Sequence, residues 1–119
     1  MNNIQVSENF RLSEFQCKCG CETVKLDSEL LRRLQAIRTQ IGRPMIINSG
    51  YRCQGHNRSV GSTDTSQHRT GRAADIVVRG MSVQQLYNIC DQRFQDGGVG
   101  RYSGHVHVDT RGSRARWAR

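Results

Sequence analysis

The chain has 119 residues, of which 35% are hydrophobic, 24% charged and 6% aromatic. This length suits one compact domain, residues 1–119, and the composition excludes an intrinsically disordered chain. No apolar run approaches the roughly 18 residues of a transmembrane helix. The net charge of +8 predicts an anionic partner, such as nucleic acid, a cell-wall polymer or an acidic lipid surface.

Three of the five cysteines alternate near the start of the chain, at Cys17, Cys19 and Cys21. An odd number of cysteines argues against a secreted disulfide framework. Alternate positions on an extended segment point the same way, so these thiols can share a soft metal ion. The usual zinc pair is spaced C-x2-C, however, and no matching second pair follows. We therefore do not expect a metal here, and the role and redox state of these cysteines stay open.

A first amphipathic helix is predicted from Asp27 or Ser28 to Ile41. Its apolar residues recur at intervals of three and four, a capping residue precedes them, and Gly42 ends the pattern. Pro44 then introduces the short apolar run MIIN. This run favours a buried strand that delivers the following residues to a surface.

A long polar loop rich in Gly, Ser, Thr and Asn is predicted from Cys53 to Thr70, with one helical turn around residues 56–60. Loops of this length in small domains usually carry function. A strand over residues 73–78 and a second amphipathic helix from Ser82 to Phe94 follow. Cys90 lies on the apolar spacing of that helix, where we expect a small core residue.

The sequence HVHVD follows a glycine-rich break. Its strict alternation predicts a strand with His105, His107 and Asp109 on one face and two valines on the other. The last nine residues, RGSRARWAR, hold four arginines around Trp117. They suit either an arm that binds an anionic polymer or a solvated tail whose tryptophan packs back onto the domain, and we favour the tail.

Two segments together offer three ligands for a metal ion. His68 precedes Asp75 by seven residues, and the HVH strand offers further imidazoles. A catalytic zinc site takes three protein ligands of this kind and leaves a fourth position for water. A carboxylate inside the apolar segment AADIVV is also costly to bury without a cation. The alternative is a surface-loop histidine, an aspartate paired with arginine, and a polar strand face.

Several strings together resemble the zinc D-alanyl-D-alanine carboxypeptidase family, whose fold is shared with the Hedgehog signalling domain. They are NSGYRC at 48–53, HN at 56–57, SQHRTGRAADI at 66–76, and GVGRY followed by HVHVDTR. The segment FRLSEFQCKCGCE, the helix LRRLQAIRTQIGRP and the final RW are similar to small, phage-associated members. The resemblance covers nearly the whole chain. It implies an α+β fold in which a short antiparallel sheet carries the zinc site and helices cover its other side.

The resemblance implies one zinc ion per chain, bound by His68, Asp75 and His107, with His105 beside it as the catalytic base. Spacing alone does not separate the two strand histidines, because alternation places both on one face. If His105 were a fourth ligand, the zinc tetrahedron would close and leave no position for water. This agrees with different roles for the two residues.

The resemblance also implies roles for residues around the metal. Arg52 matches an arginine that binds the developing oxyanion or the substrate carboxylate. Ser66 matches a serine that contacts substrate. Asp109 is expected to orient a metal ligand or to pair with Arg111. From the residues alone, Arg52 would be a solvent-facing charge and Ser66 a turn-forming residue.

The predicted function is that of a zinc metallopeptidase that hydrolyses peptide bonds next to D-amino acids in bacterial peptidoglycan. Whether it is a carboxypeptidase or an endopeptidase stays open. One alternative is a zinc-binding module of the same fold without catalysis, against which His105 and Arg52 argue. The other is a basic nucleic-acid-binding protein that uses the cysteines and the arginine tail.

We expect a monomer without a stable nucleic-acid partner and without membrane insertion. The amino terminus MNNIQVSENF lacks the basic start and apolar stretch of a signal peptide. We therefore expect synthesis in the cytoplasm, followed by action on the cell wall after release or delivery by a phage or another route.

Overall fold

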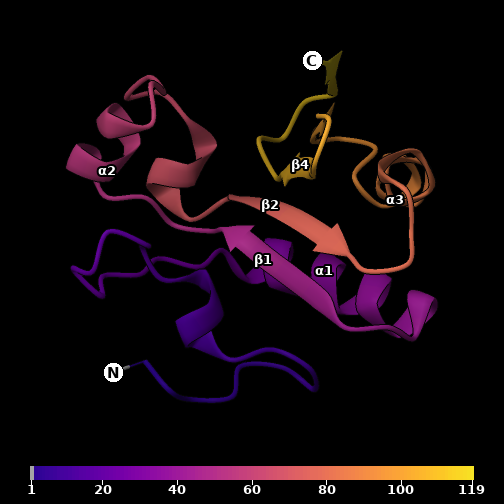
Figure 1. Cartoon of the computed structure of the whole chain (residues 1–119), viewed down its shortest axis with the longest axis horizontal. Helices are drawn as coiled ribbons and strands as arrows, with labels where there is room; N and C mark the ends of the chain where they lie inside the picture. The colour runs from indigo at the N-terminus through magenta and orange to yellow at the C-terminus, as the bar shows by residue number, and fades with distance from the viewer. Residues whose placement is uncertain (1) are drawn as a thin grey trace.

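A five-stranded sheet forms the centre of the molecule, which we describe from a computed structural model for residues 2–119 (Figure 1). The strands are β1 (Met45–Ser49), β2 (Ala73–Val78), β3 (Gly98–Arg101), β4 (Val106–Asp109) and β5 (Ala115–Ala118). The α-helices are α1 (Ser28–Ile41), α2 (Gln54–Ser59) and α3 (Val83–Arg93). Two short 3-10 helices are η1 (Leu12–Phe15) and η2 (Gln67–Thr70). Of the helices in residues 2–119, none has the length and hydrophobicity needed to span a membrane.

The strands lie in the order β1-β2-β4-β3-β5. All neighbours are antiparallel except β3 and β5, which run parallel. The predicted α+β class is confirmed. The sheet is mixed rather than purely antiparallel, because the carboxyl-terminal strand β5 runs parallel to β3. The register places Asp75 on β2 opposite His107 on β4. Two polar residues that are far apart in the sequence therefore become neighbours on one sheet.

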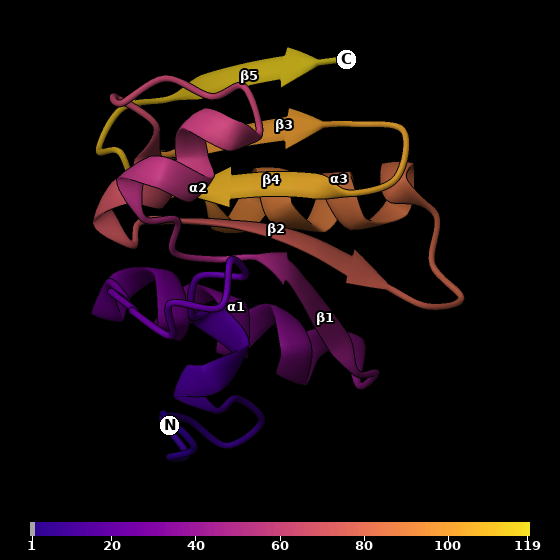
Figure 2. The same ribbon diagram turned by 60° about the vertical axis from the view of Figure 1, so that its left-hand side comes forward.

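Helices α1 and α3 cover one face of the sheet, while α2 lies over the other face (Figure 2). Helix α1 begins where the Asp27 side chain accepts a hydrogen bond from the Leu30 N–H, and it ends at Gly42 with φ of 72°. Both signals were expected from the sequence. Cys90 on α3 is fully buried in the core, as predicted. The helices thus bury their apolar faces on one side and leave the other side for polar groups.

Strands β3 and β5 were not predicted. A Cβ atom at Gly98 would lie 2.3 Å from Asp109 Oδ2, and one at Gly100 would lie 2.4 Å from the Trp117 ring. Glycine in a strand permits such close approach, but glycine-rich sequence resembles a loop. The expectation of a solvated tail was wrong for residues 115–118, because they pair with β3. The expectation that Trp117 packs back onto the protein is confirmed.

Candidate metal centre and active site

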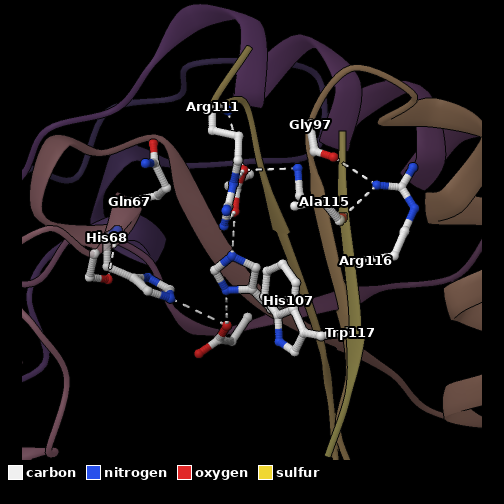
Figure 3. Close-up of polar contacts among 12 residues, drawn as sticks. Gln67, His68, Gly97, His107, Arg111, Ala115, Arg116 and Trp117 are labelled. Atoms are coloured by element: carbon white, nitrogen blue, oxygen red, sulfur yellow. Dashed lines mark hydrogen bonds and ion pairs between the residues drawn. The ribbon is translucent and has the colours of Figure 1, made fainter. Parts of the chain in front are cut away.

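His68, Asp75 and His107 meet above strands β2 and β4, with His68 supplied by η2. His68 Nε2 lies 3.3 Å from Asp75 Oδ1, and His107 Nδ1 lies 3.1 Å from the same oxygen. The two rings point toward this carboxylate from different segments (Figure 3). One ligand atom from each of the three residues lies within 4.8 Å of the others. The structure therefore brings together the three residues that the sequence nominated as ligands.

In each histidine, the ring nitrogen that faces away from Asp75 forms a second hydrogen bond. His68 Nδ1 lies 2.7 Å from the Gly50 carbonyl oxygen, to which it donates. His107 Nε2 lies 2.7 Å from Asp109 Oδ2 and donates to that carboxylate. In the neutral rings these bonds place the remaining nitrogen lone pairs toward Asp75. Outer hydrogen bonds of this kind fix which nitrogen is free to bind a metal.

The donor set fits a zinc ion. Two nitrogen lone pairs and a carboxylate oxygen at such distances repel one another unless a cation lies among them or a ring is protonated. Burial alone would raise the pKa of Asp75, but the contacts with His107 and His68, which stabilise the carboxylate when a ring is protonated, outweigh burial and hold the pKa below its ordinary value. Two histidines and one carboxylate form a typical three-ligand zinc set with a free fourth position.

Asp109 is the buried support of His107. Its side chain is fully buried, and Oδ1 accepts hydrogen bonds from the Gly98 N–H at 2.9 Å and from Arg111 Nε at 2.9 Å. Arg111 Nη2 lies 2.7 Å from Oδ2. Burial alone would raise the pKa of Asp109, but the bonds with His107 and Arg111 lower it. Asp109 therefore does both things expected of it: it contacts a candidate ligand and pairs with Arg111.

His105 lies immediately before β4, beside the three candidate ligands. Its Nε2 is 3.9 Å from Asp75 Oδ2, and 28% of its side chain is exposed. The Tyr102 ring stacks on the imidazole with centroids 4.4 Å apart. Burial lowers the pKa of His105, and the opposing effect of the Asp75 charge is smaller. The lowered pKa favours the neutral imidazole, which can accept a proton.

Arg52 is mostly buried, with 14% of its side chain exposed. Its Nη2 lies 3.1 Å from Asp75 Oδ2, Nε lies 3.0 Å from Ser49 Oγ, and Nη1 lies 3.4 Å from Asn57 Oδ1. A guanidinium has five N–H donors, so two remain. Arg52 occupies one carboxylate oxygen of Asp75 and leaves the other to the histidines. The sequence-based alternative of a solvent-facing charge is therefore wrong.

A pocket of about 470 Å³ opens over this group. Three arginines, Arg52, Arg111 and Arg119, are part of its wall. Ser66 also lines the pocket, and its hydroxyl accepts a hydrogen bond from the His68 N–H at 3.3 Å. The turn-forming role of Ser66 is thus present in the structure, whereas its contact with substrate stays a prediction. The basic wall suits a ligand that carries carboxylates.

Sequence reasoning missed two aromatic residues in this pocket. Trp117 packs against His107 with ring centroids 5.1 Å apart, and its Nε1–H donates to the Tyr102 hydroxyl at 2.9 Å. Tyr102 in turn stacks on His105. The sequence signals for the tryptophan are the final RW and the absence of a side chain at Gly100, where its ring lies. Tyr102 ends the string GVGRY, but that string does not predict its contact with His105.

Residues 8–109 match the profile of a family described as Peptidase M15. The matched range includes the three candidate ligands, His105, Arg52 and Ser66, whereas β5 with Trp117 lies beyond it. No curated protein sequence matches the chain.

Proposed function

Because the chain belongs to the peptidase M15 family of zinc D-Ala-D-Ala carboxypeptidase-like proteins, we propose that it hydrolyses peptide bonds next to D-amino acids in bacterial peptidoglycan. The observation that carries this proposal is the convergence of His68, Asp75 and His107 in one open pocket. His105 and Arg52 lie in the same pocket. A three-ligand donor set with a proton acceptor and a cation beside it suits peptide hydrolysis better than structural metal binding.

The proposed mechanism assigns one task to each group. His68, Asp75 and His107 would hold a zinc ion, which would supply an activated water molecule and a Lewis acid for the scissile carbonyl group. His105 is partly exposed, and its lowered pKa favours the neutral form. It accepts a proton from the attacking water and returns it to the leaving amine. Arg52 directs its two remaining N–H donors to the developing oxyanion or to a substrate carboxylate.

The substrate proposal rests on the charge of the pocket. Arg52, Arg111 and Arg119 line it, and the whole chain carries a net charge of +8. Peptidoglycan peptides carry free carboxylates, and the wall around them is anionic, so both the pocket and the net charge favour such a substrate. Ser66 is proposed to contact the peptide beside His68.

Hydrolysis of a peptide that ends in D-Ala-D-Ala, together with digestion of purified peptidoglycan, tests the proposal. We expect release of D-alanine or of cross-link fragments, loss of this activity with a chelator, and recovery when zinc is added. The peptide that ends in L-Ala-L-Ala is the matched control and should stay intact. A zinc-loaded protein that cleaves neither D-amino acid substrate would instead support the non-catalytic module.

A further inference from the structure

Four of the five cysteines lie together in a group that shares no residue with the histidine site. Cys17, Cys19, Cys21 and Cys53 each offer a sulfur atom, and all four sulfurs lie within 4.8 Å of one another. None of the four forms a disulfide bond. Cys17 is buried, Cys53 is partly exposed, and the other two are exposed. The group therefore lies at the edge of the protein rather than in its core.

Cys53 is brought to the other three by the segment that follows β1. The Tyr51 N–H donates to the Phe15 carbonyl at 2.8 Å, which ties this segment to the residues just before Cys17. A Cβ atom at Gly50 would lie 2.7 Å from the Phe15 carbonyl oxygen, so only glycine permits this approach. The Cys17 N–H donates to the Thr23 carbonyl at 2.9 Å and closes the loop that carries the three alternating cysteines.

The spacing of the sulfur atoms fits a tetrahedral metal site. Cys19 Sγ lies 3.4 Å from Cys17 Sγ and 3.7 Å from Cys53 Sγ. Four thiolates at about 2.3 Å from a tetrahedral zinc ion lie about 3.8 Å from one another. The observed distances are close to this value and far above the roughly 2 Å of a disulfide bond. The group thus has the ligand number and approximate separation that zinc requires.

Hydrogen bonds to three of the four sulfur atoms also favour thiolates. The Cys53 N–H donates to Cys17 Sγ at 3.4 Å, and the His56 N–H donates to Cys53 Sγ at 3.4 Å. The Thr23 hydroxyl lies 2.9 Å from Cys21 Sγ, where it can donate. Donors aimed at sulfur stabilise the deprotonated form, which is the form that binds a metal. The net charge of +8 further offsets the negative charge of four thiolates.

We propose that Cys17, Cys19, Cys21 and Cys53 bind a second, structural zinc ion. Four protein ligands close the tetrahedron and leave no position for water, so this site is not catalytic. Its effect reaches the histidine site through residues 50–53. The Gly50 carbonyl holds His68, and the neighbouring Arg52 side chain holds Asp75. A metal bound at Cys53 would fasten this segment to the amino-terminal loop.

Metal analysis and cobalt substitution of the full chain test this proposal without any mutation. Protein purified under reducing conditions should contain a second zinc equivalent beyond that of the histidine site. Replacement of zinc by cobalt should produce the intense near-ultraviolet absorption of a thiolate–cobalt bond, which two histidines and a carboxylate do not produce. A cobalt-loaded protein without this absorption would overturn the proposal.

Three variants separate this site from the proposed active site. His68→Ala should keep the thiolate–cobalt absorption, while Cys19→Ser should lose most of it. Cys90→Ala is the matched control, because it removes the one cysteine outside the group and should leave the absorption unchanged. An unmutated protein that shows the thiolate–cobalt absorption but no peptidase activity with zinc would count against the proposed function alone.

A thiol count decides between a metal site and oxidation. After denaturation in a chelator without reductant, all five cysteines of the metal-loaded protein should react with a thiol reagent. A count lowered by two or four, in protein that holds zinc only at the histidine site, would show that the group forms disulfides and would overturn the proposal.

Discussion

The histidine site and the cysteine group are two clusters of candidate metal ligands, and the protein holds their side chains in different ways. His68, Asp75 and His107 are all buried and come from two sheet strands and a short helix, and both histidines have a fixed partner behind them. The cysteines lie on loops, and two of them are exposed. Pre-positioned ligands can leave one coordination position open for chemistry, whereas loop ligands become ordered when a metal takes all four.

The two clusters also share a boundary. Residues 50–53 contribute the Gly50 carbonyl and Arg52 to the histidine site and Cys53 to the cysteine group. The comparison therefore predicts that changes in the histidine site abolish chemistry, while changes in the cysteine group alter stability first.

His68→Ala has the largest expected effect. The change removes a proposed metal ligand, so zinc at the histidine site and peptidase activity should both be lost. The protein should also become less stable, because metal binding contributes to folding. Zinc content and D-alanine release measure the outcome. The zinc of the cysteine group should remain. A variant that still hydrolyses substrate would contradict the ligand assignment.

His105→Ala should lower turnover by about two to four orders of magnitude, as expected for loss of a general base. The three proposed ligands are untouched, so zinc content and the far-ultraviolet circular dichroism spectrum should not change. His107→Ala is the partner experiment and should lose the metal. If His105→Ala lost zinc and His107→Ala kept it, the roles of the two histidines would have to be exchanged.

Asp109→Asn should weaken zinc binding at the histidine site by roughly 10 to 100-fold, the range seen when a partner behind a metal ligand is changed. The variant keeps the shape of the side chain but removes the negative charge that His107 contacts. Competition with a chelator measures the affinity. Asp91→Asn is a matched control because Asp91 pairs with Arg116 away from the pocket. Equal affinities in the two variants would refute a supporting role for Asp109.

Cys19→Ser should have the smallest effect on turnover, far below that of His105→Ala. We expect a lower midpoint of thermal unfolding, because the variant loses a proposed ligand of the metal ion that would join two loops. Differential scanning calorimetry and peptide hydrolysis, both with zinc present, measure the two quantities. Turnover as low as in His105→Ala, with zinc still at the histidine site, would mean that the cysteine group takes part in catalysis.

Local patterns in the sequence predicted several parts of the fold correctly. The cap at Asp27, the stop at Gly42 and the strand over residues 73–78 all appear in the structure. The alternation of HVHVD also predicted that His107 and Asp109 share a face, and they are in contact. These features depend on neighbouring residues, whose relation is set by the helical or strand period.

Contacts between distant segments were decided only by the tertiary structure. Cys53 completes the cysteine group because residues 50–53 run beside the amino-terminal loop, and Trp117 reaches His107 because β5 pairs with β3. Arg52 can be mostly buried because its guanidinium forms an ion pair with Asp75, a residue distant in the sequence. The order of residues along the chain does not state how far apart such residues lie in space. Sheet pairing and close packing over glycine create those distances, so they exist only once the chain has folded.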